Sequence, residues 1–366
     1  MLTAKEINRY SRQIMLPEIG IEGQQKLKSS SVLLVGVGGL GCPILQYLAS
    51  AGVGKIGIVD FDAVDETNLQ RQVIYSTEEI GSPKVEAAAK KINAINPYID
   101  VVAIDKKLSP ENALEILAPY DVIVDGSDNF ETKYLINDAC IMLNKTLVFG
   151  SIYRFQGQIS VFNFNNGPTY RCLYPESSDL ESCSAVGVLG VLPGIVGCFM
   201  ANEVIKVLLK FGDILSGKLL VIDSKSLSVH THHFSLNPEN KNITELVPMS
   251  AVCVNEFEPK NLNLFEEDLL LIDVREPYEH LAYNIGGMNF PLNILKEKLE
   301  HLKPTLTNNK KIVFYCKSGI RSKKATTIAQ SLSITNSSSL RGGLDHLTKS
   351  NYHGNKEKIS AEESIC

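Results

Sequence analysis

A strand that runs directly into a glycine-rich turn is the feature that most restricts the fold of this chain. Residues 31–41 read SVLLVGVGGLG, an apolar run that ends in the turn and leads into a helical stretch. Such a turn places backbone N–H groups at a helix N-terminus, where they can contact the phosphates of a nucleotide. Asp60 ends the next strand-like run, and a carboxylate there can accept hydrogen bonds from ribose hydroxyls. The segment therefore predicts a nucleotide-binding α/β domain.

Short runs rich in β-branched residues alternate with helical stretches in the first part of the chain. The expected strands are 32–35, 56–59, 101–104, 122–124 and 147–149. Helices are expected at 43–51 and at 83–95, with Ser82 as the N-cap and Pro83 in the first helical position. Later runs at 158–164, 218–223 and 228–234 are expected to form antiparallel strands. The alternation predicts an α/β fold with a Rossmann-like, mostly parallel sheet and helices on both faces.

Length and local polarity predict how the chain is divided. A chain of 366 residues favours two domains, each with its own core. We expect a nucleotide-binding domain at 1–236 and a polar linker with three prolines at 237–263. A smaller α/β domain is expected at 264–350, followed by a disordered polar tail at 351–366.

Composition excludes several classes of protein. A formal net charge of -5 gives no basic field, so a nucleic-acid partner is not expected. The N-terminus lacks the apolar core of a signal peptide. The apolar run 185–201 contains Pro193 and is short for a bilayer span, so no membrane partner is expected. Eight cysteines without a Cys-x-x-Cys pair argue against a disulfide framework and are typical of a cytoplasmic protein.

Polar side chains after the glycine turn favour a triphosphate over a dinucleotide. Asn68 and Arg71 lie in NLQR, Lys84 in GSPK and Asp128 in GSDN. Loss of pyrophosphate needs cations at the phosphate oxygens and the leaving group, whereas dinucleotide chemistry rarely needs two more cations there. Asp128 follows a strand and is placed to hold Mg²⁺ against the phosphates. A nucleotide-dependent oxidoreductase remains the alternative.

A second reactive site is predicted far downstream. Residues 311–322 read KIVFYCKSGIRS, a strand that delivers Cys316 into a short loop closed by Arg321. Loop N–H groups at a helix N-terminus, with Arg321 and Lys317, stabilise a thiolate or a persulfide. The loop is one residue shorter than that of cysteine phosphatases, so it suits a sulfur atom better than a phosphate.

Residues 1 to about 236 resemble the MoeB/ThiF/HesA family, which is related to the ubiquitin-activating enzymes. The resemblance is carried by RYSRQ (9–13), GVGGLGCP (36–43), VDFD (59–62), TNLQRQ (67–72), GSPKVE (81–86), DGSDN (125–129) and GQISVF (157–162). It implies an ATP-dependent adenylyltransferase that acts on the C-terminal Gly-Gly of a small ubiquitin-like sulfur carrier.

The same resemblance implies roles for single residues. The implied ATP site consists of Gly36, Gly38, Gly39, Gly41, Asp60, Asn68, Arg71, Lys84, Asp128 and Asn129, with Mg²⁺ on Asp128. Arg12 is implied to reach across a homodimer interface into the ATP site of the partner. Cys183 matches a cysteine that some members use for a covalent adduct and others do without.

One departure from the family concerns metal. Members usually carry a structural zinc held by two Cys-x-x-Cys pairs. Here Cys172 is retained, but Pro175 stands where its mate is expected, and Glu-Asn-Lys-Asn at 239–242 replaces the second pair. Because one ligand cannot make a tetrahedral site, we expect no zinc and a packed or partly exposed thiol at Cys172.

Residues of about 264–350 resemble the rhodanese family. The marks are LLLIDVREPYEH (269–280), IGGMNFPL (285–292), IVFYCKSGIRS (312–322) and LRGGL (340–344). Asp273 and Arg275 are expected to organise the active loop, and Leu347 stands where many rhodaneses carry tryptophan.

In this order the two resemblances match fused enzymes that adenylate a sulfur carrier and then sulfurate it. The MoeB-like motifs favour a carrier of the molybdopterin synthase small-subunit type, and the thiazole-pathway carrier of thiamine biosynthesis is the alternative. Expected partners are this carrier, a persulfide donor such as a cysteine desulfurase, and a second copy of the chain. A binding module whose rhodanese domain only docks partners is disfavoured by the presence of Cys316 and Arg321.

Overall fold

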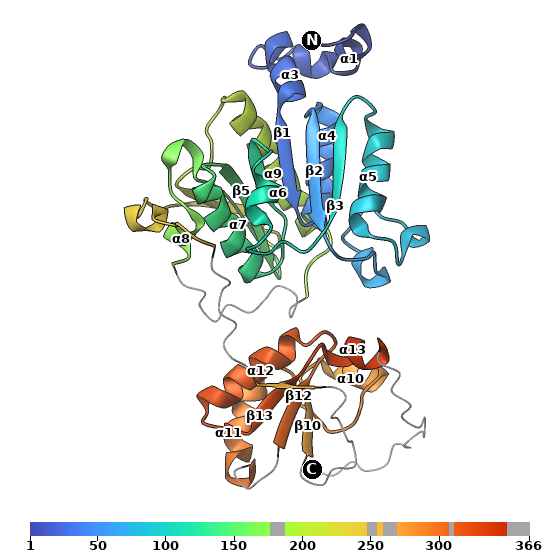
Figure 1. Cartoon of the computed structure of the whole chain (residues 1–366), viewed down its shortest axis with the longest axis vertical. Coiled ribbons are helices and arrows are strands. Elements are labelled where there is room, and N and C mark those ends of the chain that lie inside the picture. The colour runs from blue at the N-terminus through green and yellow to red at the C-terminus, as the bar shows by residue number, and fades with distance from the viewer. Residues whose placement is uncertain (176–186, 247–254, 259–268, 307–310, 350–366) are drawn as a thin grey trace. The chain divides into compact units, whose positions relative to one another are not determined.

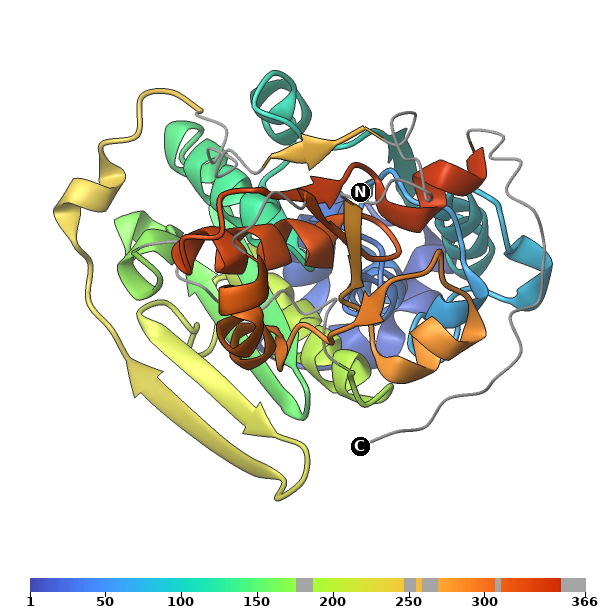
Figure 2. The same cartoon turned by 90° about the horizontal axis from the view of Figure 1, so that it is seen from below.

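The structure is a computed structural model, and it describes residues 1–175, 187–246, 255–258, 269–306 and 311–349. The chain divides into two compact units, Met1–Met249 and Ser250–Cys366. Figures 1 and 2 show both units from perpendicular directions.

An eight-stranded sheet in the order β3-β2-β1-β4-β5-β6-β7-β8 forms the centre of the first unit. Its strands are β1 (Ser31–Val35), β2 (Lys55–Asp60), β3 (Asp100–Asp105), β4 (Val122–Asp125), β5 (Thr146–Tyr153), β6 (Gln156–Phe162), β7 (Lys218–Asp223) and β8 (Ser228–His233). Neighbours from β3 to β5 pair in parallel, and those from β5 to β8 pair antiparallel. The predicted sheet is confirmed, including its later antiparallel strands.

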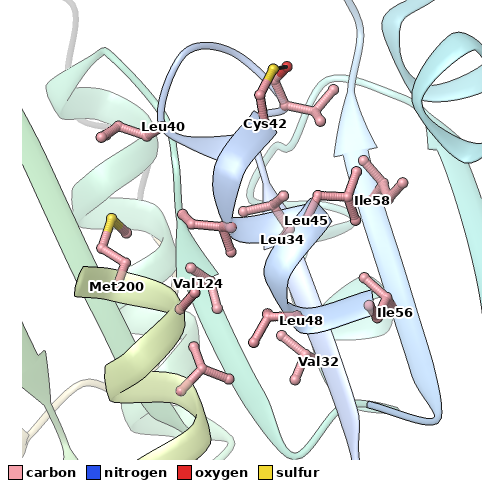
Figure 3. Close-up of a cluster of buried hydrophobic side chains, with 14 of the residues drawn as sticks. Val32, Leu34, Leu40, Cys42, Leu45, Leu48, Ile56, Ile58, Val124 and Met200 are labelled. Carbon is pink, nitrogen blue, oxygen red and sulfur yellow. Dashed lines mark hydrogen bonds between the residues drawn. The ribbon is translucent and has the colours of Figure 1, made fainter. Parts of the chain in front are cut away.

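Helices cover both faces of this sheet (Figure 1). One face carries α4 (Gly41–Ala51), α5 (Lys84–Ile95) and α9 (Leu192–Leu209), and the other carries α6 (Ala113–Leu117), α7 (Phe130–Met142) and α8 (Tyr170–Leu173). Successive side chains of a strand point to opposite faces, so Val32 and Leu34 enter the first cluster while Leu33 and Val35 enter the second. Figure 3 shows the first cluster, in which Leu45 and Leu48 of α4 lie near Val32 and Leu34 of β1, and Met200 of α9 belongs to the same cluster.

Three helices precede the sheet. They are α1 (Ala4–Arg9), α2 (Ser11–Ile14) and α3 (Gly20–Ser29), and Figure 1 shows α1 and α3 beyond the amino end of β1. The Thr3 side chain accepts the Glu6 N–H, and the Glu6 carboxylate accepts the Thr3 N–H, so a capping box begins α1.

The predicted start of α5 is wrong by one residue. Pro83 is the N-cap with ψ 129°, and the helix begins at Lys84. The reason is tertiary, because Pro83 forms an isolated antiparallel bridge with Ala63 and is held in extended backbone. Proline has no backbone N–H, so no donor is left without a partner at this cap position.

The long apolar helix α9 belongs to the core. By length and composition it could cross a membrane, but 56% of it is buried in the fold. It packs against α4, β5 and β6, and Val196, Met200 and Val204 are fully buried. This burial favours the interpretation of the apolar run as a core helix of a globular unit.

The second unit contains a five-stranded parallel sheet in the order β11-β10-β12-β13-β9. Its strands are β9 (Glu256–Phe257), β10 (Leu269–Asp273), β11 (Met288–Asn289), β12 (Lys311–Tyr315) and β13 (Ser337–Leu340). Its helices are α10 (Pro277–Ala282), α11 (Leu295–Leu306), α12 (Ile320–Ser331) and α13 (Gly343–Lys349). Leu347 is buried in one cluster with Leu340 and Leu344, so leucine packs into the core at this position.

The expected linker at 237–263 is partly incorporated into both units. Its first residues form the short helix η5 (Pro238–Lys241), which contacts Cys172 of the first unit. Further along, β9 pairs with β13 in the second sheet. The expected disordered tail at 351–366 lies outside the described residues.

Candidate functional site

The carboxyl ends of three neighbouring strands meet at the centre of the first sheet. β1 pairs with β2 on one side and with β4 on the other, so the strand order reverses at β1. The glycine turn follows β1, Asp60 ends β2, and Asp128 lies in the loop after β4. Ligands of open α/β sheets bind beyond the carboxyl ends of the strands at such a reversal. The fold therefore gathers the predicted nucleotide-binding residues at one edge.

Close packing explains why the turn after β1 is rich in glycine. Gly36 has a φ of 87°, which favours glycine, and a Cβ there would lie 2.9 Å from the backbone of Gly126. A Cβ on Gly41 would lie 2.3 Å from the Gly36 oxygen. At Gly39 a Cβ would lie 3.0 Å from Cβ of Pro193, which lies in the first turn of α9. Larger residues would push the turn out of this position.

The Asp60 carboxylate is oriented by backbone donors. Its Oδ2 accepts the N–H of Val37 at 2.9 Å, and its Oδ1 accepts the N–H of Asp62 at 2.9 Å. Burial raises the pKa of Asp60 above its usual value, although the charge of Lys84 and these hydrogen bonds act in the opposite direction. Asp60 thus lies beside the glycine turn, where its contact with ribose stays a prediction.

Asn68 is the last residue of the short helix η1 (Glu66–Asn68), and Arg71 follows it and approaches the glycine turn. The Asn68 carbonyl accepts the N–H of Arg71 at 3.1 Å, and Arg71 Nη1 donates to the Thr67 carbonyl at 3.1 Å. Cγ of Arg71 lies 3.5 Å from the position that a Cβ on Gly39 would take. The guanidinium stem therefore lies against the turn that is expected to hold phosphates.

Gln72 is a neighbour of the turn that the sequence analysis did not single out. It is buried, and its Nε2 lies 3.6 Å from the position that a Cβ on Gly38 would take. Within the described residues its Oε1 has no hydrogen-bond partner. The signal for it was its place at the end of the TNLQRQ motif.

Lys84, the second predicted cation, is held in an ion pair. Its Nζ lies 3.0 Å from Oδ2 of Asp62, and the side chain of Lys84 is 6% exposed while that of Asp62 is 54% exposed. The positive charge of Lys84 also lowers the pKa of Asp60, against the larger effect of burial.

Asp128 is exposed, and Asn129 follows it. Asn129 is the N-cap of α7, where its Oδ1 accepts the Thr132 N–H at 2.9 Å. The capping bond fixes the end of the Asp128 loop.

A buried ion pair between Lys133 and Asp125 supports the Asp128 loop. Lys133 Nζ donates to Asp125 Oδ2 at 3.0 Å, to the Ser127 carbonyl at 2.8 Å and to the Gly150 carbonyl at 3.2 Å. Asp125 Oδ1 accepts the Ser127 N–H and hydroxyl at 2.9 and 2.5 Å. Lys133 was not identified from the sequence, although a lysine among buried residues of a helix is a recognisable signal.

For two predicted site residues, Arg12 and Cys183, the described residues of a single chain show no contact with this site. Arg12 lies in α2 and is exposed. Cys183 lies outside the described residues.

Cys172 is surrounded by hydrogen-bond donors. Its Sγ accepts the N–H groups of Thr169 and Asn237, each at 3.4 Å, and the side-chain N–H of Asn240 at 3.6 Å. Burial opposes ionisation, but these bonds and the Thr169 hydroxyl lower the pKa of Cys172 below its usual value. Within the described residues, no group of three or more metal-ligating side chains is present.

In the second unit, Cys316 follows β12 at the bottom of a loop that leads into α12. The Gly319 N–H donates to Cys316 Sγ at 3.2 Å, and Ser322 Oγ lies 3.6 Å from the same sulfur. Cys316 is 1% exposed. The structure thus places Cys316 in the expected loop at the start of α12 with its sulfur shielded from solvent, while sulfur binding there stays a prediction.

Arg321 is fixed by a partner from α10. Its Nη1 and Nη2 lie 2.6 and 2.8 Å from the two carboxylate oxygens of Glu279. Burial opposes the charge, but Glu279 and the Cys316 sulfur raise the pKa of Arg321 above its usual value. Glu279 was not singled out from the sequence, although it lies in the REPYEH motif.

Asp273 and Arg275 organise the segment that carries Glu279. Arg275 donates from Nε and Nη2 to the Asp273 carboxylate and from Nη2 to the Tyr283 carbonyl. His280 Nδ1 lies 2.9 Å from Asp273 Oδ2. These residues therefore act on the Cys316 loop indirectly, through α10.

The LRGGL motif closes the loop from the other side. The carbonyls of Cys316 and Lys317 accept the N–H groups of Leu344 and Asp345, each at 2.9 Å. A Cβ on Gly343 would lie 2.4 Å from the Cys316 oxygen, so this close approach requires glycine.

Comparison with known proteins agrees with this geometry. Residues 10–244 match the ThiF family, and residues 260–350 match the rhodanese-like domain.

Relatives match over nearly the whole chain. The chain is 40% identical to the probable adenylyltransferase/sulfurtransferase MoeZ of Mycobacterium tuberculosis, over 94% of this chain and 93% of the relative. It is 38% identical to the adenylyltransferase and sulfurtransferase MOCS3-1 of Zea mays, over 94% of this chain and 81% of the relative. The sulfur carrier protein adenylyltransferase of Thermus thermophilus is 48% identical over 69% of this chain and 98% of the relative.

Solved structures support the fold of the first unit. The structure of E. coli MccB with ATP aligns with a TM-score of 0.56 and 24% identity, over 63% of this chain and 73% of that chain.

Proposed function

Because the chain belongs to the ThiF family and carries a C-terminal rhodanese-like domain, we propose that it adenylates a ubiquitin-like sulfur carrier and then sulfurates it. The observation that supports this most directly is the presence of two sites on one chain. The first unit gathers a glycine turn, a carboxylate and two cations at a strand reversal, and the second holds a buried thiol that accepts the Gly319 N–H. Names of the relatives pair the same two activities.

The nucleotide site is assigned as follows. The glycine turn and its helix N-terminus hold the phosphates, Asp60 binds ribose, and Asn68, Arg71 and Lys84 contact the phosphate oxygens. The exposed carboxylate of Asp128 is suited to Mg²⁺, which would neutralise developing charge on the phosphates. Lys133 and Asp125 hold the loop that presents Asp128.

Adenylation makes the carrier electrophilic. The terminal glycine carboxylate attacks the α-phosphorus, pyrophosphate leaves, and an acyl-adenylate results. A carboxylate is a poor electrophile, whereas AMP is a good leaving group. Arg71 and Lys84 supply the positive charge that the departing pyrophosphate requires.

Sulfur transfer follows at the acyl carbon. The outer sulfur of a Cys316 persulfide attacks, AMP leaves, and an acyl disulfide joins carrier and enzyme. A thiol then attacks Cys316 Sγ in that disulfide, so the thiocarboxylate departs and Cys316 is left in a new disulfide with the attacking thiol. Cys183 is the candidate for this thiol, and an external thiol reductant must then restore both cysteines.

The pathway follows from the relatives. A carrier of the molybdopterin synthase small-subunit type fits best, since a relative from Porphyra purpurea, 41% identical over 80% of this chain, is named probable molybdopterin-synthase adenylyltransferase. The thiazole-pathway carrier is the alternative. We further propose a cysteine desulfurase as persulfide donor and a cytoplasmic location without nucleic-acid or membrane partners, in keeping with the cysteine spacing and the acidic charge of the sequence.

The function is tested by incubating the full chain with ATP, Mg²⁺, a persulfide donor and each candidate carrier that ends in Gly-Gly. The mass of the carrier should rise by about 16 Da as one acyl oxygen is replaced by sulfur. A carrier that lacks its last glycine should show no change. Equal conversion of the truncated carrier would contradict the proposed chemistry.

Arg12 provides a test of the proposed homodimer. If it completes the ATP site of a partner, Arg12→Ala and Asp128→Ala should each be inactive. A mixture whose subunits have exchanged should regain activity, because one site of each mixed dimer has both residues intact. With random exchange, about a quarter of the wild-type rate is expected. No recovery, with exchange verified by tagged subunits, would mean that Arg12 acts within its own chain. Wild-type activity of Arg12→Ala alone would mean that Arg12 takes no part.

Cys172 provides a test for metal. We propose that hydrogen bonds from Asn237 and Asn240 to Cys172 hold the segments around residues 172 and 237–240 together in place of a structural zinc. Purified protein should therefore hold far less than one zinc per chain. Because its pKa is lowered, Cys172 should also be alkylated before Cys42 and Cys140, whose pKa values burial raises. Stoichiometric zinc by elemental analysis, with a protected Cys172, would show that other residues rebuild the site.

A further inference from the structure

We propose that Asp62 is a positioning residue that holds the Lys84 ammonium in place for the phosphates of the nucleotide. The identity of the nucleotide rests on the proposed function. Asp62 has no role in the site assigned above, and its carboxylate contacts the cation rather than any proposed ligand position.

The backbone brings the two side chains together. The Lys84 N–H donates to the Asp62 carbonyl at 2.9 Å, Ala63 and Pro83 form an antiparallel bridge, and the Val64 N–H donates to the Ser82 carbonyl at 2.9 Å. The Val64 carbonyl accepts the Gly81 N–H at 2.8 Å. Residues 62–64 and 81–84 are thus joined along their length. The Asp62–Lys84 pair is therefore fixed by the chain itself and does not depend on a chance side-chain encounter.

Burial makes the pair necessary for Lys84. With 6% of its side chain exposed, an ammonium without a partner would be costly. Within the described residues, Asp62 Oδ2 at 3.0 Å is the acceptor that contacts Lys84 Nζ. Two further N–H donors of the ammonium are left for a ligand.

Exposure makes the pair useful for binding. The side chain of Asp62 is 54% exposed, so water screens its charge. Such a half-exposed ion pair holds the Lys84 ammonium in position. It cancels less of the positive charge than a fully buried carboxylate would. When phosphates arrive, Lys84 can contact them while Asp62 remains solvated.

Asp62 also connects the two ends of the site. Its backbone N–H orients the Asp60 carboxylate at 2.9 Å, and its side chain orients Lys84. One residue thereby sets the spacing between the proposed ribose contact and the proposed phosphate contact. Since the N–H survives any substitution except proline, replacing the side chain tests the phosphate contact alone.

The experiment measures binding of ATP and of AMP, each with Mg²⁺, to the full chain by calorimetry. Asp62→Ala should weaken ATP binding about tenfold and AMP binding less than about twofold, since AMP lacks the outer phosphates. Asp62→Asn keeps an acceptor for Lys84 and should recover most of the affinity. Asp105→Ala removes an exposed carboxylate from the end of the adjacent strand β3 and should have little effect.

A double-mutant cycle separates positioning from a structural role. In a Lys84→Met background, Asp62→Ala should change ATP affinity less than about twofold, because the group that it positions is gone. Three results would overturn the proposal: unchanged ATP affinity in Asp62→Ala, an equal loss in the Lys84→Met background, or a loss that disappears at saturating Mg²⁺, which would make Asp62 a metal ligand. If the wild-type chain binds no ATP, the proposed function itself fails.

Discussion

Replacing Asp128 with alanine should abolish the carrier-dependent exchange of pyrophosphate into ATP. The carboxylate is exposed in the loop after β4, next to the glycine turn, and is proposed to hold Mg²⁺. Without it, charge on the leaving pyrophosphate is left without its metal counter-ion, and a loss of at least about a hundredfold is expected. The measurement is incorporation of labelled pyrophosphate into ATP with a carrier that ends in Gly-Gly.

A matched control is available in the next turn of the chain. Glu131 is an acidic residue in the first turn of α7, three positions after Asp128. Glu131→Ala removes the same charge without removing the proposed ligand and should retain near wild-type exchange. Exchange by Asp128→Ala at the wild-type rate would remove Asp128 from the site, and equal losses in both variants would point to general electrostatics instead.

Replacing Cys316 with alanine should block sulfur transfer to the carrier but leave adenylation intact. Pyrophosphate exchange depends on the first unit and should remain, whereas the increase of about 16 Da in carrier mass should disappear. In this loop the Gly319 N–H donates to Cys316 Sγ, and Arg321, at the start of α12, is held by Glu279. Mass spectrometry of the carrier, with exchange measured in parallel, resolves the two activities.

Cys198→Ala serves as the control for that experiment. Cys198 is an exposed free cysteine on α9 and should be dispensable for both steps. If Cys316→Ala forms thiocarboxylate at the wild-type rate, the second unit does not deliver the sulfur and is better described as a docking domain. If Cys316→Ala also loses pyrophosphate exchange, the two activities are not separable as proposed.

Local patterns in the sequence determined most of the first sheet and both reactive loops. The run 31–41 specifies a strand and a turn because its apolar residues favour extended backbone and Gly36 has a φ of 87°, which favours glycine. The stretch from 311 to 322 likewise specifies a strand, a loop and a helix start. These features depend on neighbours within a few residues, so a single sequence suffices to predict them.

The partners of the functional side chains were decided by the tertiary structure. Asp62 meets Lys84, Glu279 meets Arg321, and Asn240 meets Cys172 across sequence separations of 22, 42 and 68 residues. Such contacts require the packing of segments that are distant in the sequence. The start of α5 was decided in the same way, because the bridge to Ala63 holds Pro83 in extended backbone. Sequence patterns thus named the groups that carry the chemistry, while the fold selected the residues that hold them in place.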